Sequence, residues 1–344
     1  ILLIGLWGGL IRVGWQWPFV PSTLPLAHGP LMINGFLGTL IGLERAVALG
    51  KQWAYGAPLL AALGTLLLLA GIGGIAGYGL LLLSGLLLTL VMLTILRLHY
   101  TLDTAIILAG VVLWLIGNLL WMAGYAIGQV VYWWAGFLLL TIAGERLELS
   151  RLLRLPPTVV ALLLGTISLY VSGLVVTLFA PLWGARLIGV ALIGLALWLL
   201  RYDIARRRIK AGGQARFTAL ALLSGYGWLI VAGLLALSYP GQMAGPYYDA
   251  LLHAIFLGFV FTMIFGHAPI VFPAVLQRPL PYHPRFYSHL LLLHVTLAVR
   301  IIGDMLLSMS MRRWGALLNG LVLLLFLGNT LTALRVGVKA KDHA

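Results

Sequence analysis

Histidines are the residues of this sequence whose types and spacing best suggest chemistry. The chain has eight of them and no cysteine, which excludes disulfides, thiolate metal sites and iron–sulfur clusters. His28 and His253 each stand near the start of a long apolar run. An ionisable side chain within a bilayer is costly, so such a histidine is a functional candidate. Two imidazoles at one depth could provide both axial ligands of a six-coordinate haem. Alternatively, they only form hydrogen bonds near the membrane interface.

Small residues surround both histidines. Gly29 and Gly35 follow His28, and Ala254 and Gly258 follow His253. We expect these residues to let a flat macrocycle approach the backbone.

A second set of residues with metal-binding chemistry is predicted nearer the opposite membrane surface. At a rise of 1.5 Å per residue, His267 lies about 21 Å beyond His253, and Glu44 about 24 Å beyond His28. Such groups could hold copper, zinc, non-haem iron or a second haem. The candidates are His267, His294, His289, Glu44 and Glu145. The alternative is a solvated inner rim on which the two glutamates are interface charges.

Arg300 and Asp304 are four residues apart in a late apolar run. This spacing predicts an ion pair on one helix face. Alternatively, Arg300 holds a haem propionate.

The composition sets the fold class that must position these residues. Of 344 residues, 62% are hydrophobic and only 9% are charged, whereas a soluble domain has about 25% charged residues. We therefore predict an all-α, multi-pass membrane protein, with residues 1–344 forming a single transmembrane domain. Twelve spans of about 20 residues are expected. They lie at 1–15, 29–49, 56–77, 79–98, 103–125, 129–149, 157–179, 183–201, 217–238, 249–273, 287–309 and 314–336.

Basic residues predict the orientation of these spans. Seventeen of the 22 Lys and Arg residues follow even-numbered spans or lie in the C-terminal tail. Cytoplasmic loops are enriched in Lys and Arg, so both termini are predicted to be cytoplasmic. The net charge of +14 is spread over short loops, which indicates contact with membrane lipid and not with nucleic acid.

An internal repeat is visible in three of the predicted spans. Gly-Phe followed by an apolar residue begins at 35, 136 and 258, and an ionisable residue stands nine positions after each glycine. Those residues are Glu44, Glu145 and His267. The spacing favours three four-helix pseudo-repeats, at 1–98, 103–201 and 217–336. The alternative is chance, since Gly, Phe and Leu are abundant.

Two segments resemble known membrane haem proteins. Ala27-His28-Gly29-Pro30-Leu31-Met32-Ile33 resembles span 2 of haem–copper oxidase catalytic subunits, whose histidine ligates a low-spin haem. His253-Ala254, Gly258, Thr262-Met263-Ile264, Gly266-His267 and Arg300 resemble the NnrS family, haem proteins tied to nitric oxide stress and denitrification. The resemblance implies twelve helices in three arcs, as in subunit I of the oxidases. It also implies one haem b held by His28 and His253, in a prokaryotic inner membrane.

The sequence departs from both families. Leu251 stands where the oxidases have a second histidine, and no histidine lies between His99 and His253 to supply copper ligands. A standard oxygen-reducing centre is therefore not expected. The NnrS span 2 reads His-Ala-His-Glu, whereas this chain reads Leu26-Ala27-His28-Gly29.

The main hypothesis is a haem-binding membrane protein with an electron-transfer or redox role, linked to nitric oxide or respiratory metabolism. Its enzyme class, if any, would be an oxidoreductase, and its redox partner a quinol or a cytochrome. One alternative is a transporter or channel without cofactor, in which Glu44, Glu145 and His267 carry protons or bind substrate. Another is a non-catalytic subunit of a respiratory complex.

Overall fold

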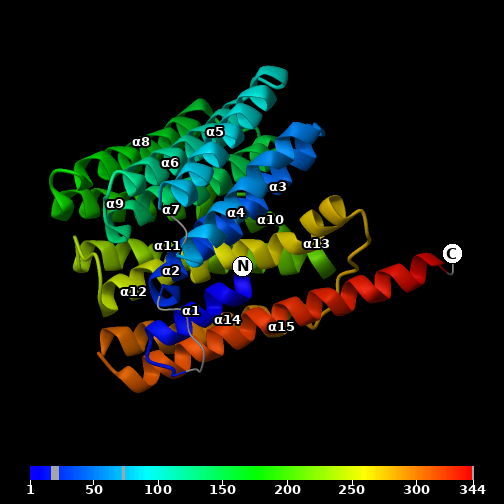
Figure 1. The fold of residues 1–344 in the computed structure, drawn as a ribbon. Helices are drawn as coiled ribbons and strands as arrows, with labels where there is room; N and C mark the ends of the chain where they lie inside the picture. Colours follow the sequence, from blue (N-terminus) through cyan, green and yellow to red (C-terminus); the bar gives the residue numbers. More distant parts are fainter. Residues whose placement is uncertain (17–22, 72–73, 343–344) are drawn as a thin grey trace. The chain divides into compact units, whose positions relative to one another are not determined.

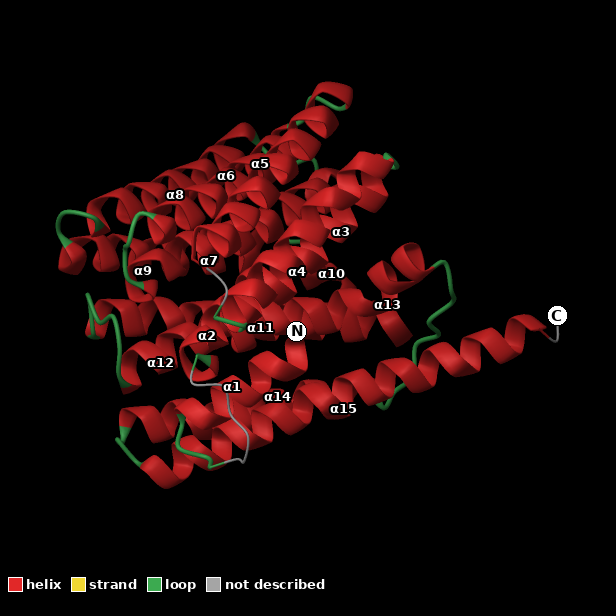
Figure 2. Cartoon of the chain, viewed as in Figure 1, coloured by secondary structure: helices red, strands yellow, loops and turns green. Residues whose placement is uncertain are grey.

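The computed structural model describes residues 1–16, 23–71 and 74–342, and all regular secondary structure in these ranges is helical (Figures 1 and 2). Helices suit this sequence because every backbone hydrogen bond closes within the segment, which hydrocarbon surroundings require. Local signals set several helix ends. Three helices begin at a proline, Pro157, Pro181 and Pro246, where the missing N–H has no cost. The helix ending at Leu49 is followed by Gly50 at φ +67°, a left-handed position that favours glycine.

Among the described residues, eleven helices are long and apolar enough to cross a membrane. Their positions agree with the predicted spans 2 to 12. The predicted first span, 1–15, is the eleven-residue helix Leu2–Arg12, whose length of about 16 Å is half the hydrocarbon thickness. The eleven are Leu24–Leu49, Gln52–Leu69, Gly74–Leu98, Leu102–Met122, Ile127–Leu153, Pro157–Thr177, Pro181–Tyr202, Gly213–Ser238, Pro246–Pro273, Phe286–Met305 and Met309–Val336.

The chain divides into two compact units, and the first is Ile1–Glu148. Successive helices pack on one another in it, with α4 on α5 and α5 on α6, while α1 packs on α2. Glycines permit the closest approaches: a Cβ on Gly110 would lie 2.9 Å from the Phe137 carbonyl of α7. The elements are α1 (Leu2–Arg12), α2 (Leu24–Pro30), η1 (Leu31–Leu37), α3 (Gly38–Leu49), η2 (Gln52–Tyr55), α4 (Gly56–Leu69), α5 (Gly74–Leu98), α6 (Leu102–Met122) and α7 (Ile127–Leu149).

The second unit is Leu149–Ala344. Here α9 packs on both α8 and α11, α11 packs on η4 and α13, and α14 packs on α12 and α15. The elements are η3 (Ser150–Leu153), α8 (Pro157–Thr177), α9 (Pro181–Tyr202), α10 (Ala205–Arg208), α11 (Gly213–Ser238), α12 (Pro246–His253), η4 (Ala254–Phe261), α13 (Thr262–Leu276), α14 (Phe286–Met305) and α15 (Met309–Asp342). The boundary between the units lies within the predicted repeat 103–201, and the threefold repeat stays a prediction.

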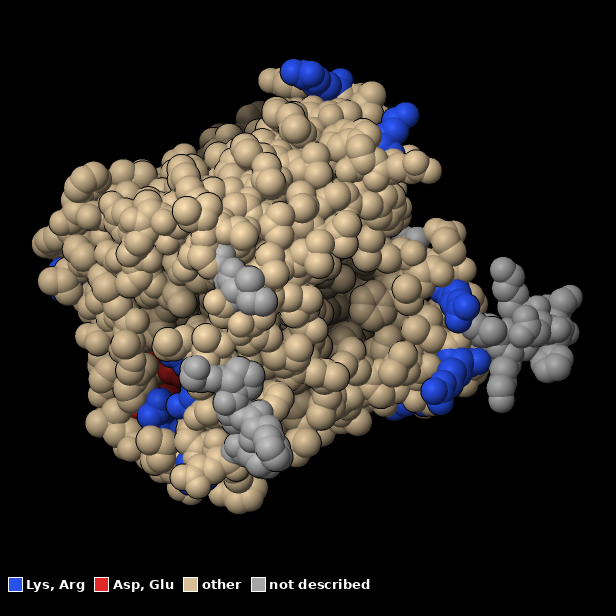
Figure 3. Space-filling model, in the orientation of Figure 1, with Lys and Arg blue, Asp and Glu red and all other residues tan. Residues whose placement is uncertain are grey.

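The surface has the character expected of a lipid-facing protein. On the face shown in Figure 3, uncharged atoms cover most of what is visible, and Lys and Arg side chains form a few separate groups. Leu83, Leu86 and Leu90 lie on one side of α5 and are each about half exposed. Exposed apolar stripes of this kind are unfavourable in water and suited to hydrocarbon. The fold and surface therefore support a multi-pass membrane protein.

Candidate functional site

His28 and His253 each lie within three residues of the start of a π-helical segment. His28 lies in α2, three residues before η1, and His253 is the last residue of α12, immediately before η4. Both π segments begin four residues before the glycine of the repeat motif, Gly35 in η1 and Gly258 in η4. The third copy of the motif, around Gly136, lies in α7, which is α-helical throughout. Short π-helical insertions occur frequently at functional sites, so the structure singles out these two spans.

His28 is positioned by α1. Its Nδ1 lies 2.7 Å from the carbonyl oxygen of Gly5. A carbonyl only accepts, so Nδ1 carries the proton and the neutral ring has its lone pair on Nε2. The ring also packs against Gly9, where a Cβ atom would lie 2.7 Å from Cε1 of the imidazole. This tautomer is the one in which metal-ligating histidines are usually held, with the remote nitrogen bonded to a carbonyl or carboxylate.

His253 is held in the same tautomer by its own helix. Its Nδ1 donates to the backbone carbonyl of Asp249, one turn earlier, at 2.8 Å. The same nitrogen lies 3.4 Å from Oδ1 of the Asp249 carboxylate. Since α12 begins at Pro246, His253 is in its second turn and not at its very start. His253 stands five residues before Gly258, whereas His28 stands seven before Gly35, so the two histidines are two positions apart in the repeat register.

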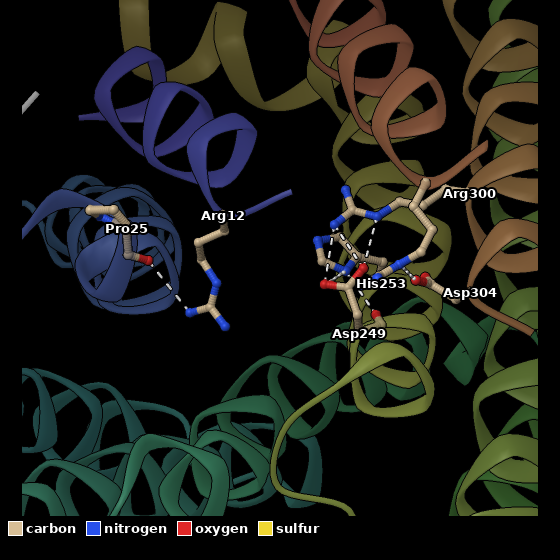
Figure 4. Close-up of polar contacts among 7 residues, drawn as sticks. Arg12, Pro25, Asp249, His253, Arg300 and Asp304 are labelled. Atoms are coloured by element: carbon tan, nitrogen blue, oxygen red, sulfur yellow. Dashed lines mark hydrogen bonds and ion pairs between the residues drawn. The ribbon is translucent and has the colours of Figure 1, made fainter. Parts of the chain in front are cut away.

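A buried guanidinium clamps the Asp249 carboxylate. Arg300 of α14 donates from Nε at 3.0 Å and from Nη2 at 2.9 Å to Oδ2, and from Nη2 to Oδ1 at 3.2 Å. The Arg300 side chain is 8% exposed, and that of Asp249 is 24% exposed. Figure 4 shows the contacts of Asp249 with Arg300 and with His253, and separately the contact from Arg12 to the Pro25 carbonyl, which is 3.5 Å long. Bidentate Arg–carboxylate pairs are among the strongest and most directional hydrogen-bonded contacts in proteins.

The predicted Arg300–Asp304 pair was wrong. Asp304 accepts from Nε of Arg312 at 2.5 Å, across the turn between α14 and α15, while Arg300 reaches Asp249. Spacing along one helix indicates which residues share a face, but partners on packed helices offer better-aligned donors. Asp304 is completely buried, and its Oδ2 has no hydrogen-bond partner among the described residues. Four charged side chains therefore make two ion pairs beside His253.

The glycines next to the histidines have a different role from the one predicted. A Cβ on Gly258 would lie 2.5 Å from Trp228, and one on Gly35 would lie 2.8 Å from both Ile1 and Thr65. These two glycines therefore allow close helix packing and do not face open space. A Cβ on Gly29 would meet only Ile127, at 3.9 Å, so this position still allows a close approach.

Two of the predicted inner ligands, His289 and His294, are held in environments that do not favour metal binding. Trp228 Nε1 donates to Nδ1 of His294 at 2.9 Å, which places the imidazole proton on Nε2. Neither nitrogen of His294 then offers a lone pair. His289 is 1% exposed and is packed among phenylalanine rings, with Asn329 3.2 Å from its Nδ1. Those rings are Phe217, Phe265, Phe286 and Phe326.

The remaining inner candidates do not gather into one site. His267 donates from Nδ1 to the carbonyl of Met263 at 2.8 Å, which fixes the same tautomer as in His253 and does not by itself argue against metal binding. Glu44 and Glu145 both bind the guanidinium of Arg45, with Glu44 Oε1 at 3.3 Å. Among the residues that the structure describes, no three His, Asp or Glu side chains form a group that could hold a metal ion. The inner metal site therefore gains no support.

The sequence interpretation did not include two features of this site. Asp249 has a visible signal, because a residue four positions before a helical histidine lies on the same face. The π-helical segments have no comparable signal, since the apolar pattern around them is uniform. Their functional association depends on the backbone geometry alone.

Comparison with known protein families identifies the family of this chain. The family described as "Domain of unknown function (DUF8744)" matches residues 1–335. The chain belongs to the DUF8744 family. No curated protein and no solved structure matches it. For this DUF8744 protein, function must therefore be argued from the residues described above.

Proposed function

We propose that this DUF8744 protein is a membrane haem protein of the haem–copper oxidase/NnrS type, in which His28 and His253 ligate one haem b. The observation that carries the proposal is the matched local architecture of the two histidines. Each donates from Nδ1 to a backbone carbonyl, so that Nε2 is the ligating nitrogen, and each precedes a π-helical segment. The resemblance in the sequence around both residues points to the same pair.

The donor set fits a low-spin haem. Two imidazoles can supply the two axial nitrogens of a six-coordinate iron, and their hydrogen-bonded Nδ1 atoms leave Nε2 as the donor. A Cβ atom added at Gly29 would meet only Ile127, at 3.9 Å, so close packing does not fill this position beside His28. A bis-histidine haem supplies reversible one-electron chemistry and has no open coordination position. The role of the chain is then to hold the imidazoles, exclude water with apolar helices and set the reduction potential.

The biological setting follows from the same proposal. The protein would lie in a prokaryotic inner membrane with twelve spans in three pseudo-repeats and both termini in the cytoplasm. Its role would be electron transfer or redox sensing in nitric oxide or respiratory metabolism, with a quinol or a cytochrome as the electron partner. The basic loop residues Arg206, Arg207 and Arg208 of α10 support this orientation, because cytoplasmic loops retain such charges.

Absorption spectroscopy of the purified protein tests the proposal. Protein from haem-replete cells should show a sharp α band of b type on reduction. The band should be lost in His28→Ala and in His253→Ala. His99→Ala is the matched control, since His99 is exposed beyond the end of α5 and the same substitution there should leave the band unchanged. A colourless preparation, or a band that survives both substitutions, would refute the proposal.

A transporter without cofactor is the second candidate, and the Arg45 cluster favours it. A guanidinium that is 13% exposed and is bound by carboxylates of two membrane-spanning helices is typical of substrate or proton pathways. In this case, metal-free protein in proteoliposomes would support a flux that Glu44→Gln abolishes. A non-catalytic respiratory subunit would instead co-purify with other subunits and have neither property.

A further inference from the structure

We propose that Asp249, oriented by Arg300, sets the reduction potential of the haem through His253. The inference rests on the proposed function, because it concerns the same ligand. Asp249 and Arg300 are positioning residues in this scheme. Neither one contacts the metal.

The first step is the geometry on α12. Asp249 precedes His253 by one helical turn, so its backbone carbonyl and its carboxylate both face the same ring nitrogen. The carbonyl lies 2.8 Å from Nδ1, and carboxylate Oδ1 lies 3.4 Å from it. An acceptor at Nδ1 increases the electron density at Nε2 and strengthens imidazole as a ligand. The effect is larger when the acceptor side carries a full negative charge.

The second step is the fixed position of that charge. Arg300 binds the Asp249 carboxylate through three donor contacts of 2.9 to 3.2 Å. Because the guanidinium is 8% exposed, water screens it weakly, and its charge acts at close range on whatever His253 binds. The second pair, Asp304 and Arg312, is neutral in sum and adds no net charge. Asp249 and Arg300 therefore act on the ligand with opposite signs.

The opposite charges of Asp249 and Arg300 predict that removing each one shifts the midpoint potential in an opposite direction. A negative charge beside His253 favours the oxidised, more positive iron, so removing it should favour reduction. Asp249→Asn should favour the reduced haem about tenfold in the reduction equilibrium. This change corresponds to a rise of about 59 mV in the midpoint potential for one electron. Arg300→Gln leaves Asp249 uncompensated and should lower the potential by a similar factor. The double variant should return near the wild-type value.

The test is a spectroscopic redox titration of the purified protein and the three variants. Asp203→Asn is the matched control, because Asp203 is a buried acid held by Tyr226 and its loss should not move the potential. A purely structural role would loosen His253 in both single variants and shift both potentials the same way. If Asp249→Asn and Arg300→Gln bind haem but shift its midpoint potential in the same direction, or not at all, this inference is overturned. The proposed function would remain intact.

A variant or a wild-type protein that contains no haem also gives a result that can be interpreted. If Asp249→Asn does not retain haem, Asp249→Glu must retain it at the wild-type potential, because the charge is kept. A Glu variant that also loses haem would overturn the electrostatic role. Absence of haem from the wild-type protein would instead refute the proposed function itself.

Discussion

The contact between α1 and His28 allows a sharp test of how the ligand is positioned. Gly9 faces the imidazole, and a Cβ added there would lie 2.7 Å from Cε1, 2.9 Å from Nδ1 and 3.3 Å from Nε2. Normal carbon contacts are about 3.5 to 4.0 Å. In Gly9→Ala the ring must therefore move by roughly 1 Å. The hydrogen bond to the Gly5 carbonyl, now 2.7 Å, cannot survive such a movement unchanged.

Three terms determine the expected stability change. Overpacking costs about 1–3 kcal/mol, and weakening the hydrogen bond costs about 0.5–1.5 kcal/mol. Alanine regains about 1 kcal/mol over glycine within a helix. The free energy of unfolding of Gly9→Ala should therefore fall by about 0.5–3.5 kcal/mol.

Thermal unfolding in detergent, read together with haem content per chain, measures both consequences. Gly79→Ala is the matched control. It lies in α5 with nothing within 4 Å of the added Cβ, so only the helix-propensity gain should remain. Gly9→Ala should be less stable than this control and should bind haem more weakly. If the two variants unfold at the same temperature and retain the same haem, then α1 does not position His28.

Two further predictions concern stability in the second unit. Trp228→Phe removes the donor to half-buried His294, and the free energy of unfolding should fall by about 1–3 kcal/mol. A double-mutant cycle with His294→Leu measures the coupling, and additive effects would contradict the hydrogen bond. Leu307 has φ +54° in the turn before α15 and is 60% exposed. Leu307→Gly should therefore raise the free energy of unfolding by up to about 1 kcal/mol, since a left-handed conformation costs a side chain about 1–2 kcal/mol. The control, Leu306→Gly at φ −84°, should be destabilising in the same unfolding assay, and a stabilised control would refute the argument.

The agreement between predicted and observed spans has a simple physical origin. Uninterrupted apolar runs, with proline and glycine at their ends, are sufficient to place helices in a membrane. The first span was the exception, because residues 1–15 are apolar but only Leu2–Arg12 is helical. The start of α12 was also placed late in the sequence interpretation, since Pro246 begins the helix before the apolar run does.

Side-chain partners were less predictable than helices. Arg300 and Asp304 share a helix face, yet each binds a residue on another segment. Likewise, Gly35 and Gly258 proved to be packing positions. Sequence spacing defines faces, whereas the partner of a face depends on which helix packs against it.

The sequence by itself determined the membrane class, the positions of most helices and the choice of His28 and His253 as candidates. These properties follow from apolar length and from the cost of ionisable groups in hydrocarbon, which are local quantities. Only the tertiary structure decided the tautomers of the histidines, the Asp249–Arg300 clamp and the π-helical segments. The tautomer of His28 and the Asp249–Arg300 clamp depend on which donors and acceptors meet when different helices pack together. The tautomer of His253 and the π-helical segments depend on the backbone geometry of their own helices, which composition alone does not reveal.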